Sequence, residues 1–466
     1  MTPKERLAIP PQEMPEQNPL LRAHNMEEVA LGYTAEMAKR EASRCLNCTA
    51  KPCVNGCPVK IDIPAFLSAA AEGNFKKALQ IIRKDSLLPA VCSRVCPQER
   101  QCQKFCTVGK MVRDVSRAVA IGRVERYCAD NVEPEKTVCA PPTGKRVAVI
   151  GSGPASITCA ADCARAGHDV TMFEAFHKPG GVLVYGIPEF RLPKRIVAKE
   201  IDTLRSMGVK IETDFVVGKT RRLSDMKEDF DAIFIGTGAG LPKFMDIEGE
   251  NLIGVFSANE YLTRANLMKA YIEDHAATPF WHGRKVAVLG GGNVAMDAAR
   301  MALRLGAEEV HLIYRRSERE MPARSEEVHH AKEEGVKFHT LVNAKRILGD
   351  EDERVRSIEC LRYELGAPDA SGRRSPVAIP GSEFEFPVDT VIVAVGSGAN
   401  PLIAATTPEI LTDTKGHVIV NEVSRMTTMP GVFAGGDIVL GAATVILAMG
   451  EGRAAARGIN KWLAKK

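Results

Sequence analysis

The sequence predicts an α-helical N-terminal domain followed by an α/β region in which one domain is inserted into another. Three observations lead to this prediction. Ten of the 13 cysteines lie before residue 140, among helical stretches such as Ile63 to Lys84. A segment with three prolines and no periodicity, residues 131–144, follows them. Beyond it, a strand, a glycine turn and a helix occur twice, at Arg146 to Ala166 and at Lys285 to Leu305, which is typical of α/β domains.

The composition is that of an ordinary globular chain and excludes several classes of protein. The 466 residues correspond to about three domains. Hydrophobic residues make up 45% and charged residues 26%, which excludes a disordered or collagen-like chain. The net charge of +4 indicates no nucleic-acid partner. The apolar run from Ile438 to Met449 is shorter than the about 20 residues of a membrane helix, and the N-terminus lacks the apolar core of a signal peptide. We therefore expect no membrane association and a cytoplasmic location.

Eight of the early cysteines form two tight groups with the spacing of metal ligands. In a reducing compartment such groups indicate metal rather than disulfides, and both zinc and iron–sulfur clusters accept four sulfurs. Cys-Pro occurs in both groups, as at the end of bacterial ferredoxin runs, which favours 4Fe–4S clusters. In two-cluster ferredoxins the cysteine before proline binds the other cluster, so Cys57 can join the second group and Cys106 the first; spacing alone leaves this open. The groups are Cys45, Cys48, Cys53 and Cys57, then Cys92, Cys96, Cys102 and Cys106.

The first glycine turn carries Gly151 and Gly153, with Pro154 and Ala155 at the start of the helix. Such a turn lets a pyrophosphate approach backbone amides at a helix start. The third position is Ser156, a departure that adds a side chain where helix and strand pack closely. Glu174 closes the next strand 23 residues after Gly151, where an acid can bind a ribose hydroxyl. The turn therefore predicts dinucleotide binding. Cys159 and Cys163, on the helix that follows, are interpreted as packing residues.

The second glycine turn matches the pattern fully, with Gly290, Gly292, Asn293, Val294 and Ala295. The strand after its helix ends in Arg315 and Arg316 rather than in an acid. A carboxylate there would repel a 2′-phosphate, whereas guanidinium groups attract it, so this site favours NADP(H) over NAD(H). The alternative is a solvated basic strand end.

Two dinucleotide sites suggest FAD and a nicotinamide, with hydride passing between them. Three later segments resemble those of two-dinucleotide-domain flavoproteins. Two are chain crossings that contain Gly238 and Gly396, and the third, residues 431–437, ends in Gly436 and Asp437 near the ribityl chain. The helix after Thr444 would point its amino terminus at the flavin. We therefore expect a split FAD domain at 145–254 and 386–466, an inserted NADP(H) domain at 255–385, and the cysteine domain at 1–140. A flavin in the same chain also needs an acceptor of single electrons. Zinc cannot accept them, so this favours iron–sulfur clusters over zinc at the two cysteine groups.

From about residue 5 to its end, the chain resembles the small (beta) subunit of NADPH-dependent glutamate synthase. Similar relatives are the large subunit of electron-bifurcating NADH-dependent ferredoxin:NADP oxidoreductase and the amino-terminal half of dihydropyrimidine dehydrogenase. The motifs that carry the resemblance are CLNC-x4-CVNGCPVKIDIPAF, LPAVCSRVCPQERQC, IGRVERY, PGGVLVYGIPEFRLPK, RRSEREMPAR and GVFAGGDIV.

This resemblance implies specific ligands for two clusters. One cluster would be bound by Cys45, Cys48, Cys53 and Cys106. The other would use Cys57, Cys96, Cys102 and a non-cysteine ligand, which aligns with Glu125 in IGRVERY. Cys92 then becomes a neighbour, although the choice between Glu125 and Cys92 stays open. The alternative for Glu125 is a surface carboxylate with Arg123 and Arg126 alongside. Gly180, Gly181 and the segment Tyr185 to Pro193 would lie near the isoalloxazine.

The resemblance predicts an electron-transfer enzyme without a catalytic side chain, because the cofactors carry the chemistry. NADPH would reduce FAD, and two 4Fe–4S clusters would pass electrons to a partner, the large subunit in a glutamate synthase. The second hypothesis is the bifurcating large subunit, whose partners are ferredoxin and a small flavin and 2Fe–2S subunit. A third, from another class, is a zinc-stabilised, redox-sensing nucleotide-binding module.

Overall fold

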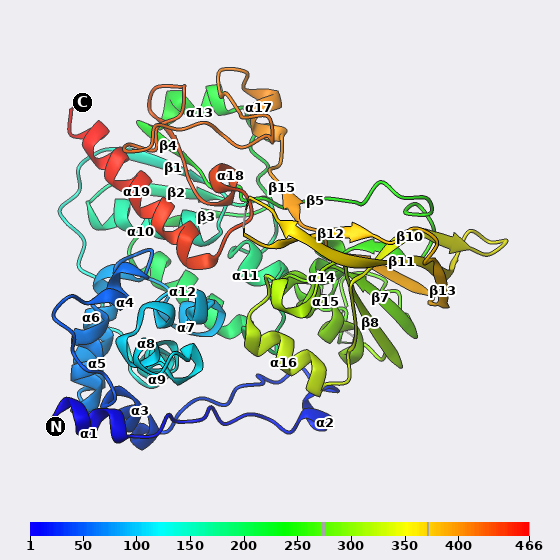
Figure 1. Ribbon diagram of the computed structural model, residues 1–466. Helices are drawn as coiled ribbons and strands as arrows, with labels where there is room; N and C mark the ends of the chain where they lie inside the picture. Colours follow the sequence, from blue (N-terminus) through cyan, green and yellow to red (C-terminus); the bar gives the residue numbers. More distant parts are fainter. Residues whose placement is uncertain (273–275, 371, 466) are drawn as a thin grey trace.

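The computed structural model describes residues 1–272, 276–370 and 372–465. A helical N-terminal domain lies beside two α/β domains, and the C-terminal helix α19 (Val445–Leu463) begins beside the helical domain and runs along the first α/β domain, away from the helical domain, to the C-terminus (Figure 1). The longer helices of the N-terminal domain are α3 (Ala35–Ala42), α5 (Ile63–Ala71), α6 (Phe75–Asp85), α7 (Pro89–Val95) and α9 (Ile121–Asn131). Its short elements are α1 (Pro3–Ala8), α2 (Pro19–Arg22), α4 (Pro52–Asn55), η1 (Gln98–Arg100), η2 (Gln103–Phe105), α8 (Thr107–Met111) and η3 (Val115–Arg117).

The helical stretch expected from Ile63 to Lys84 is confirmed, and it consists of two helices with a break between them. Gly73 follows α5 with a φ of +81°, a conformation that ends helices and that glycine adopts at little cost. The Asn74 side chain then accepts a hydrogen bond from the Lys77 amide at 3.1 Å and begins α6. The break folds α6 back against α5, which closes the domain around its loops.

The first α/β domain contains a parallel five-stranded sheet in the order β16-β4-β1-β2-β3. The last strand in the sequence pairs with β4 inside this sheet, so the chain returns to the domain after leaving it, as a split domain requires. The strands are β1 (Arg146–Ile150), β2 (Asp169–Phe173), β3 (Lys210–Glu212), β4 (Ala232–Ile235) and β16 (Val432–Ala434). The helices are α10 (Pro154–Arg165), α11 (Val182–Tyr185), α12 (Lys194–Ser206), α13 (Leu223–Asp229), α17 (Leu402–Thr406) and α18 (Asp437–Leu440), together with α19.

The inserted domain contains a second parallel five-stranded sheet, in the order β6-β14-β7-β8-β9. Its strands are β6 (Val255–Ser257), β7 (Lys285–Leu289), β8 (Glu309–Tyr314), β9 (Lys337–Thr340) and β14 (Thr390–Val393), and its helices are α14 (Ala258–Asn266), α15 (Asn293–Arg304) and α16 (Ser325–Glu333), with η5 (Glu318–Glu320) before α16. An antiparallel sheet projects from it, made of β10 (Val342–Gly349), β11 (Val355–Pro368), β12 (Arg374–Ala378) and β13 (Phe384–Pro387) (Figure 1).

The expected boundary at 385/386 is too early. β14 pairs in parallel with both β6 and β7, and its Val391 and Ile392 are fully buried in the inserted domain. The inserted domain therefore extends through Val393. Two short strands lie at the chain crossings, β5 (Leu241–Pro242) just after the first crossing and β15 (Ser397–Gly398) within the second, and they pair antiparallel with each other.

The helical domain shares its hydrophobic core with the first α/β domain. Cys92 on α7 places its sulfur 3.4 Å from the sulfur of Met449 on α19. Arg453, also on α19, donates a hydrogen bond of 2.8 Å to the Asp85 carbonyl at the end of α6. The two domains thus pack directly on one another, although a segment without regular structure joins α9 to β1. Among the described helices, none combines the length and the apolar composition that crossing a bilayer requires.

Candidate functional site

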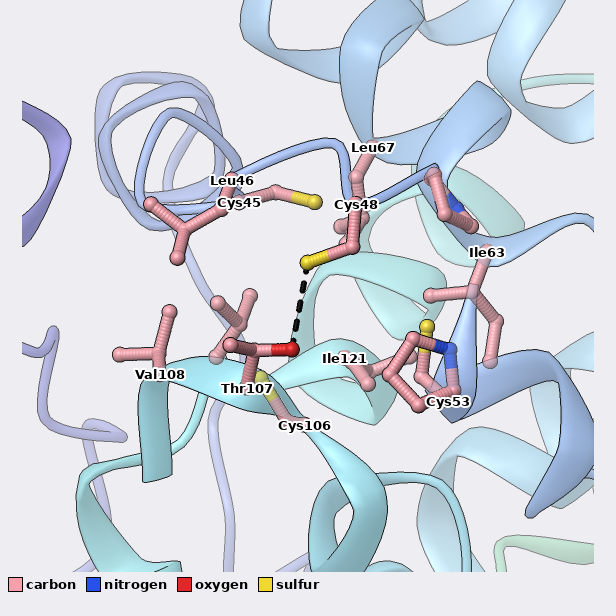
Figure 2. Close-up of a pocket in the computed structure, with 13 residues that line it drawn as sticks. Cys45, Leu46, Cys48, Cys53, Ile63, Leu67, Cys106, Thr107, Val108 and Ile121 are labelled. Atoms are coloured by element: carbon pink, nitrogen blue, oxygen red, sulfur yellow. Dashed lines mark hydrogen bonds between the residues drawn. The ribbon is translucent and has the colours of Figure 1, made fainter. Parts of the chain in front are cut away.

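Four of the predicted sulfur ligands line one small cavity in the helical domain. Figure 2 shows the sulfurs of Cys45, Cys48, Cys53 and Cys106 directed toward a common space, with apolar side chains such as Leu67 around it. Cys45 and Cys48 lie on the loop after α3, Cys53 lies in α4, and Cys106 precedes α8. The loop that carries Cys106 thus reaches back to the first group. This is the arrangement that the resemblance implied, and we call these four residues the first thiol group.

Burial disfavours the thiolate form in the first thiol group when no metal is bound. Desolvation raises the pKa of Cys53 to about 12, with the neighbouring Cys45 and Cys106 adding to the effect. Desolvation also raises the pKa of Cys45. A cation in the cavity would offset the charge of four converging thiolates, which is the chemistry of a metal or cluster site.

Cys57, Cys96 and Cys102 converge at a second place with Glu125, and we call these four residues the second thiol group. Burial, together with smaller effects of Glu125 and Cys96, raises the pKa of Cys57 to about 11. Burial likewise raises the pKa of Cys102, which faces Cys96, Cys57 and Glu125. Gly56 makes the approach of these loops possible, because a Cβ there would lie 2.8 Å from the Gln101 carbonyl oxygen.

Glu125 on α9 is buried, with 7% of its surface exposed. Its Oε1 atom has no hydrogen-bond partner among the described residues, and burial raises the pKa of the carboxyl to about 8. Its arginine neighbours pair elsewhere, Arg126 with Glu28 at 2.9 Å and Arg123 with Glu326 at 3.4 Å. The alternative of a surface carboxylate is therefore wrong. A buried oxygen without a partner beside three thiols fits a ligand to a metal centre.

We predict that Glu125→Ala alters the spectrum of one iron–sulfur cluster, whereas Cys92→Ala leaves both clusters in place. Glu125 has a buried oxygen without a described partner in the second thiol group, whereas the Cys92 sulfur, which adjoins Cys96, also contacts Met449. Electron paramagnetic resonance and iron content of the two variants, prepared without oxygen, check this. Unchanged iron and unchanged spectra in Glu125→Ala would remove the residue from the ligand set, and iron loss in Cys92→Ala would put Cys92 in its place.

The first glycine turn has the open space that a pyrophosphate needs. Gly151 has a φ of +90°, and a Cβ there would lie 2.5 Å from the Gly236 carbonyl oxygen. Gly153 precedes Pro154 and Ala155 of α10, and a Cβ there would meet no heavy atom of the described chain within 4 Å. The turn thus leaves unfilled space in front of the α10 N-terminus, where backbone amides attract anions.

Ser156 is accommodated because a glycine lies opposite it. Its hydroxyl lies 3.4 Å from the Gly236 carbonyl oxygen, and a Cβ on Gly236 would approach that hydroxyl to 2.2 Å. The Ser156 side chain, which departs from the motif, therefore occupies the space that the absent side chain of Gly236 leaves free after β4. The helix and the strand remain in close contact. The packing role expected for Cys159 and Cys163 is confirmed, since both are fully buried on α10.

Glu174 lies at the end of β2 with its carboxylate oriented by two donors. Its Oε1 accepts a 2.8 Å hydrogen bond from the Phe176 amide, and its Oε2 accepts one from the Ser152 hydroxyl. Burial raises the pKa of the carboxyl. The Ser152 hydroxyl also accepts a 2.8 Å bond from the Gly180 amide. Ser152, which the sequence pattern leaves unspecified, thus connects the turn to the acid.

Gly180 and Gly181 lie against the glycine turn. A Cβ on Gly181, which has a φ of +55°, would approach the Gly153 Cα to 2.8 Å. This contact places the pair beside the first glycine turn, and its position near the isoalloxazine stays a prediction. A Cβ on Gly180 would lie 2.4 Å from the Val184 side chain, so side-chain packing at Gly180 and backbone packing at Gly181 explain the two glycines.

The segment after β16 completes this site. Gly436 has a φ of +81°, and a Cβ there would lie 2.8 Å from the Ala155 side chain, so the two turns touch. Asp437 follows, and its Oδ1 is buried without a hydrogen-bond partner in the described part of the chain; burial raises the pKa of this carboxyl to about 6. Such an acceptor fits the hydroxyls of a ribityl chain.

Thr444 begins α19 by accepting a hydrogen bond from the Leu447 amide at 3.4 Å. Gly238 and Gly396, on the crossings, both have positive φ.

The second glycine turn has the same design. A Cβ on Gly290 would lie 2.4 Å from the Ala394 carbonyl oxygen, whereas the nearest atom to one on Gly292 is Pro322 Cγ at 3.9 Å. Asn293 begins α15, and its Oδ1 accepts a 2.9 Å bond from the Arg324 amide. Val294 is half exposed and Ala295 is buried.

The two arginines after β8 have different surroundings. Arg315 is exposed. Arg316 is 8% exposed and pairs with Asp369 at 2.8 Å, while its Nε donates to the Arg374 carbonyl at 2.8 Å. Arg316 therefore fixes the end of the β11–β12 hairpin beside the nucleotide turn, and Arg315 is the guanidinium that faces solvent there.

We predict that Arg315→Glu raises the KM for NADPH about 10-fold, or about 1.4 kcal/mol, and the KM for NADH less than about 2-fold. An acid at this position would repel the 2′-phosphate, which only NADPH carries. Steady-state kinetics with both coenzymes check this, with Arg319→Glu as the matched control because Arg319 is exposed nearby. An equal effect of Arg315→Glu on both coenzymes would contradict the role assigned to Arg315.

Ion pairs that the sequence analysis did not anticipate hold the domains together. Arg191, in the segment after α11, donates to Asp297 on α15 at 2.6 Å and lies 3.0 Å from Glu327 on α16. Phe190 beside it packs under Arg304 at 3.8 Å from the ring centroid. The only sequence signal for this network is the presence of charged residues on the buried face of α15.

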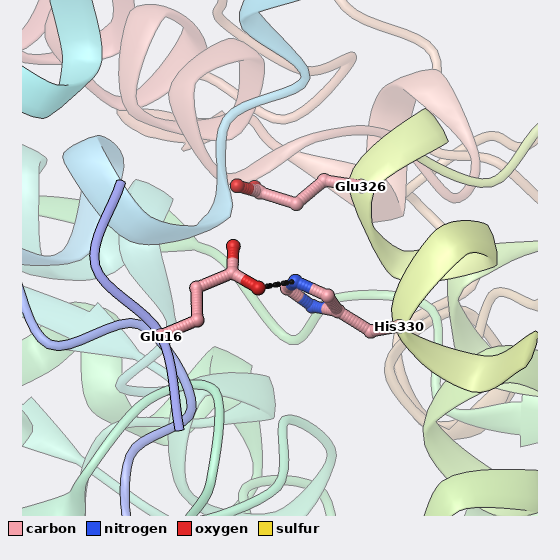
Figure 3. Close-up of side chains that lie close together, drawn as sticks. All are labelled: Glu16, Glu326 and His330. Carbon is pink, nitrogen blue, oxygen red and sulfur yellow. Dashed lines mark hydrogen bonds and ion pairs between the residues drawn. The ribbon is translucent and has the colours of Figure 1, made fainter. Parts of the chain in front are cut away.

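A second junction joins the N-terminal arm to α16. Glu16, Glu326 and His330 lie close together there, and His330 is 3.0 Å from Glu16 (Figure 3). These are metal-binding residue types, but guanidinium groups already neutralise both carboxylates. Arg22 lies 3.2 Å from Glu16, and Arg324 lies 2.6 Å from Glu326. We interpret this cluster as an ion-pair junction.

Comparisons with known proteins agree with this arrangement. Residues 22–137 match a family described as dihydropyrimidine dehydrogenase domain II, 4Fe-4S cluster, and residues 145–452 match the pyridine nucleotide-disulphide oxidoreductase family. The glutamate synthase [NADPH] small chain of Escherichia coli is 36% identical over 460 residues, which cover 96% of each chain. The chain belongs to the glutamate synthase small-subunit family.

Members of the glutamate synthase small-subunit family differ in length. The beta subunit of the NADP(+)-dependent formate dehydrogenase of Moorella thermoacetica is 40% identical over 88% of this chain, but this chain spans only 60% of it. Among solved structures, Mycobacterium tuberculosis FprA in complex with NADPH superimposes with a TM-score of 0.58 at 20% identity, covering 70% of this chain and 85% of FprA. That likeness confirms the two-dinucleotide-domain fold.

Proposed function

We propose that this protein transfers electrons from NADPH, through FAD and two 4Fe–4S clusters, to another polypeptide. FAD, when bound, accepts hydride from NADPH, and the clusters carry single electrons onward. The residues described above would hold these groups: the turn at Gly151–Gly153 with Glu174 and Asp437 for FAD, the turn at Gly290–Gly292 for NADP(H), and the two thiol groups for the clusters. No side chain has to give or take a proton in the transfer between cofactors.

The observation that carries this proposal is the contact between the second thiol group and α19. Gln101, next to Cys102, donates a 3.3 Å hydrogen bond to Thr444 at the start of α19. Pro58, next to Cys57, packs beside Gly450, and a Cβ on that glycine would lie 3.6 Å from the Pro58 carbonyl oxygen. α19 begins where the first α/β domain would bind its flavin. The second thiol group therefore lies beside the proposed flavin site, which supports its role as the first acceptor of electrons from the flavin.

The test is an anaerobic preparation with metal, flavin and acid-labile sulfide analysis, followed by addition of NADPH. We expect about eight irons and one FAD per chain, and bleaching of both flavin and cluster absorbance. Zinc in place of iron, or visible absorbance that NADPH does not bleach, would refute the proposal and favour a nucleotide-binding module.

The partner is a separate matter, because relatives that share these domains are named for different assemblies. They include glutamate synthase small chains, a formate dehydrogenase beta subunit and the beta subunit of an NADPH-Fe(3+) oxidoreductase. Coverage of 96% of the Escherichia coli small chain supports a glutamate synthase large subunit as partner. Mass spectrometry of what co-purifies discriminates this partner from the small flavin and 2Fe–2S subunit of a bifurcating enzyme.

A further inference from the structure

Two loops from different domains meet beside the second thiol group. The first, which we call the cluster loop, is residues 97–101 and joins Cys96 to Cys102 in the helical domain. The second, which we call the nucleotide loop, is residues 321–325 and leads into α16 in the inserted domain. Arg100 of the cluster loop donates hydrogen bonds of 2.8, 2.8 and 3.2 Å to three consecutive carbonyls of the nucleotide loop, those of Met321, Pro322 and Ala323. The two loops are therefore in direct contact.

The nucleotide loop also borders the second glycine turn. The nearest atom to a Cβ on Gly292 would be Pro322 Cγ, at 3.9 Å, so the loop forms one side of the space that the turn leaves open. The Arg324 amide donates a 2.9 Å hydrogen bond to the Asn293 side chain at the start of α15. A pyrophosphate that fills the open space would therefore lie against the nucleotide loop.

Arg324 extends this connection to the second thiol group. It is 6% exposed, and its side chain donates to the Arg94 carbonyl on α7 and, at 3.2 Å, to the Gln98 side chain of the cluster loop. A hydrogen bond with Cys92 and burial raise the pKa of Cys96, whereas the Arg324 guanidinium opposes that rise. One buried residue thus holds the nucleotide turn through its backbone and acts on a proposed cluster ligand through its charge.

We propose that Arg324 couples the two sites, so that reduction of the cluster in the second thiol group weakens the binding of NADP⁺. The inference rests on the proposed function, to which it adds a regulation. An added electron attracts the guanidinium more strongly and draws the nucleotide loop toward the cluster. Because the backbone of that loop holds Asn293 and borders the open space, this movement disturbs the fit of a bound pyrophosphate. NADP⁺ would thus leave as the electron reaches the second thiol group.

The experiment uses the full holoprotein and 2′-phospho-ADP-ribose as probe, which carries the phosphates of NADP⁺ but has no nicotinamide and accepts no hydride. A redox titration followed by electron paramagnetic resonance measures the midpoint potential of one cluster, identified as the signal that Cys57→Ser removes. We expect a saturating concentration of the probe to lower this potential by about 59 mV. By linkage, that shift corresponds to binding of the probe about 10-fold weaker when the cluster is reduced.

Two variants test the route of the coupling. Arg324→Gln keeps the backbone bond to Asn293 but removes the cation, and we expect the effect on binding to fall from about 10-fold to about 2-fold or less. Arg100→Gln removes an exposed side chain of the same contact, so it is informative even if loss of the buried cation prevents folding, and it should at least halve the shift in potential. Arg453→Gln is the matched control, because Arg453 joins the helical domain to the flavin domain through carbonyls at the end of α6. It should keep the full shift.

Three outcomes would overturn the coupling proposal: a wild-type potential that the probe leaves unchanged, a potential that the probe raises, or a shift that Arg453→Gln reduces as much as Arg100→Gln does. The bleaching by NADPH tests the proposed function separately. Bleaching of both flavin and clusters, with a potential that the probe does not move, would leave the proposed function standing and show that the coupling is wrong. Absence of bleaching would refute the proposed function and, with it, the coupling.

Discussion

Replacing Gly153 with valine is expected to give a folded protein that purifies without flavin. The residue has φ and ψ of −71° and −179°, an extended conformation open to any amino acid. No heavy atom of the described chain lies within 4 Å of a Cβ built there, so the apo fold accepts a Cβ without a clash. This open space is the one through which a pyrophosphate reaches the backbone at the start of α10.

We expect FAD affinity to fall at least about 100-fold, or about 2.7 kcal/mol, without loss of the thermal unfolding transition. Flavin absorbance per chain and circular dichroism check the two halves of this prediction. Gly292→Val is the matched control, since Gly292 has a similar backbone, with φ and ψ of −94° and 178°, and similar open space. It should keep FAD and lose NADPH binding. Full flavin content in Gly153→Val would show that the first turn is not the flavin site.

Replacing Cys106 with serine is expected to remove the cluster of the first thiol group and to leave the other cluster in place. The cavity would keep three sulfurs, and Cys57, the thiol that sequence spacing offers instead, does not line it. Iron content should fall from about eight to about four atoms per chain. Delivery of electrons to a protein acceptor should be lost, while flavin-dependent reduction of ferricyanide by NADPH should persist.

Cys57→Ser should remove the other cluster, so the two variants should retain different paramagnetic resonance spectra. Cys139→Ser is the control, because Cys139 is a partly exposed cysteine outside both thiol groups. Identical residual spectra in Cys106→Ser and Cys57→Ser would show that both cysteines bind the same cluster. The assignment of Cys106 to the first thiol group and of Cys57 to the second would then be wrong.

Local patterns predicted the parts of the site that a few consecutive residues build. Gly151 and Gly153, and likewise Gly290 and Gly292, reveal their turns because the strand, the glycine turn and the helix follow one another directly in the sequence. The close approach of Gly151 to Gly236 and of Gly290 to Ala394, by contrast, is a tertiary contact. The fold class follows from the same units and is confirmed by the two sheets.

Tertiary contacts decided what the sequence left open. The hydroxyl of Ser156 is tolerated because of Gly236, which lies 80 residues later in the sequence. Arg316 pairs with Asp369 on the β11–β12 hairpin, which is also far away in the sequence. Cys106 joins the first thiol group because its loop packs against Gly56. The spacing of the cysteines in the sequence does not predict this contact. The boundary of the inserted domain was misplaced because β14 reads equally well as a strand of either sheet, and only its pairing with β6 and β7 assigns it.

The pairing of β5 with β15 has a consequence for how such a chain could have arisen. Entry to and exit from the nicotinamide domain lie side by side, and β6 and β14 are neighbours inside it. A domain whose two ends meet can be gained by a host gene in one insertion, without rethreading the host sheet. The nicotinamide domain is thus arranged as an inserted unit. The ion pairs of Arg191 with Asp297 and of Arg22 with Glu334, and the hydrogen bond from Arg324 to Gln98, are contacts across its border that a newly inserted domain would have lacked.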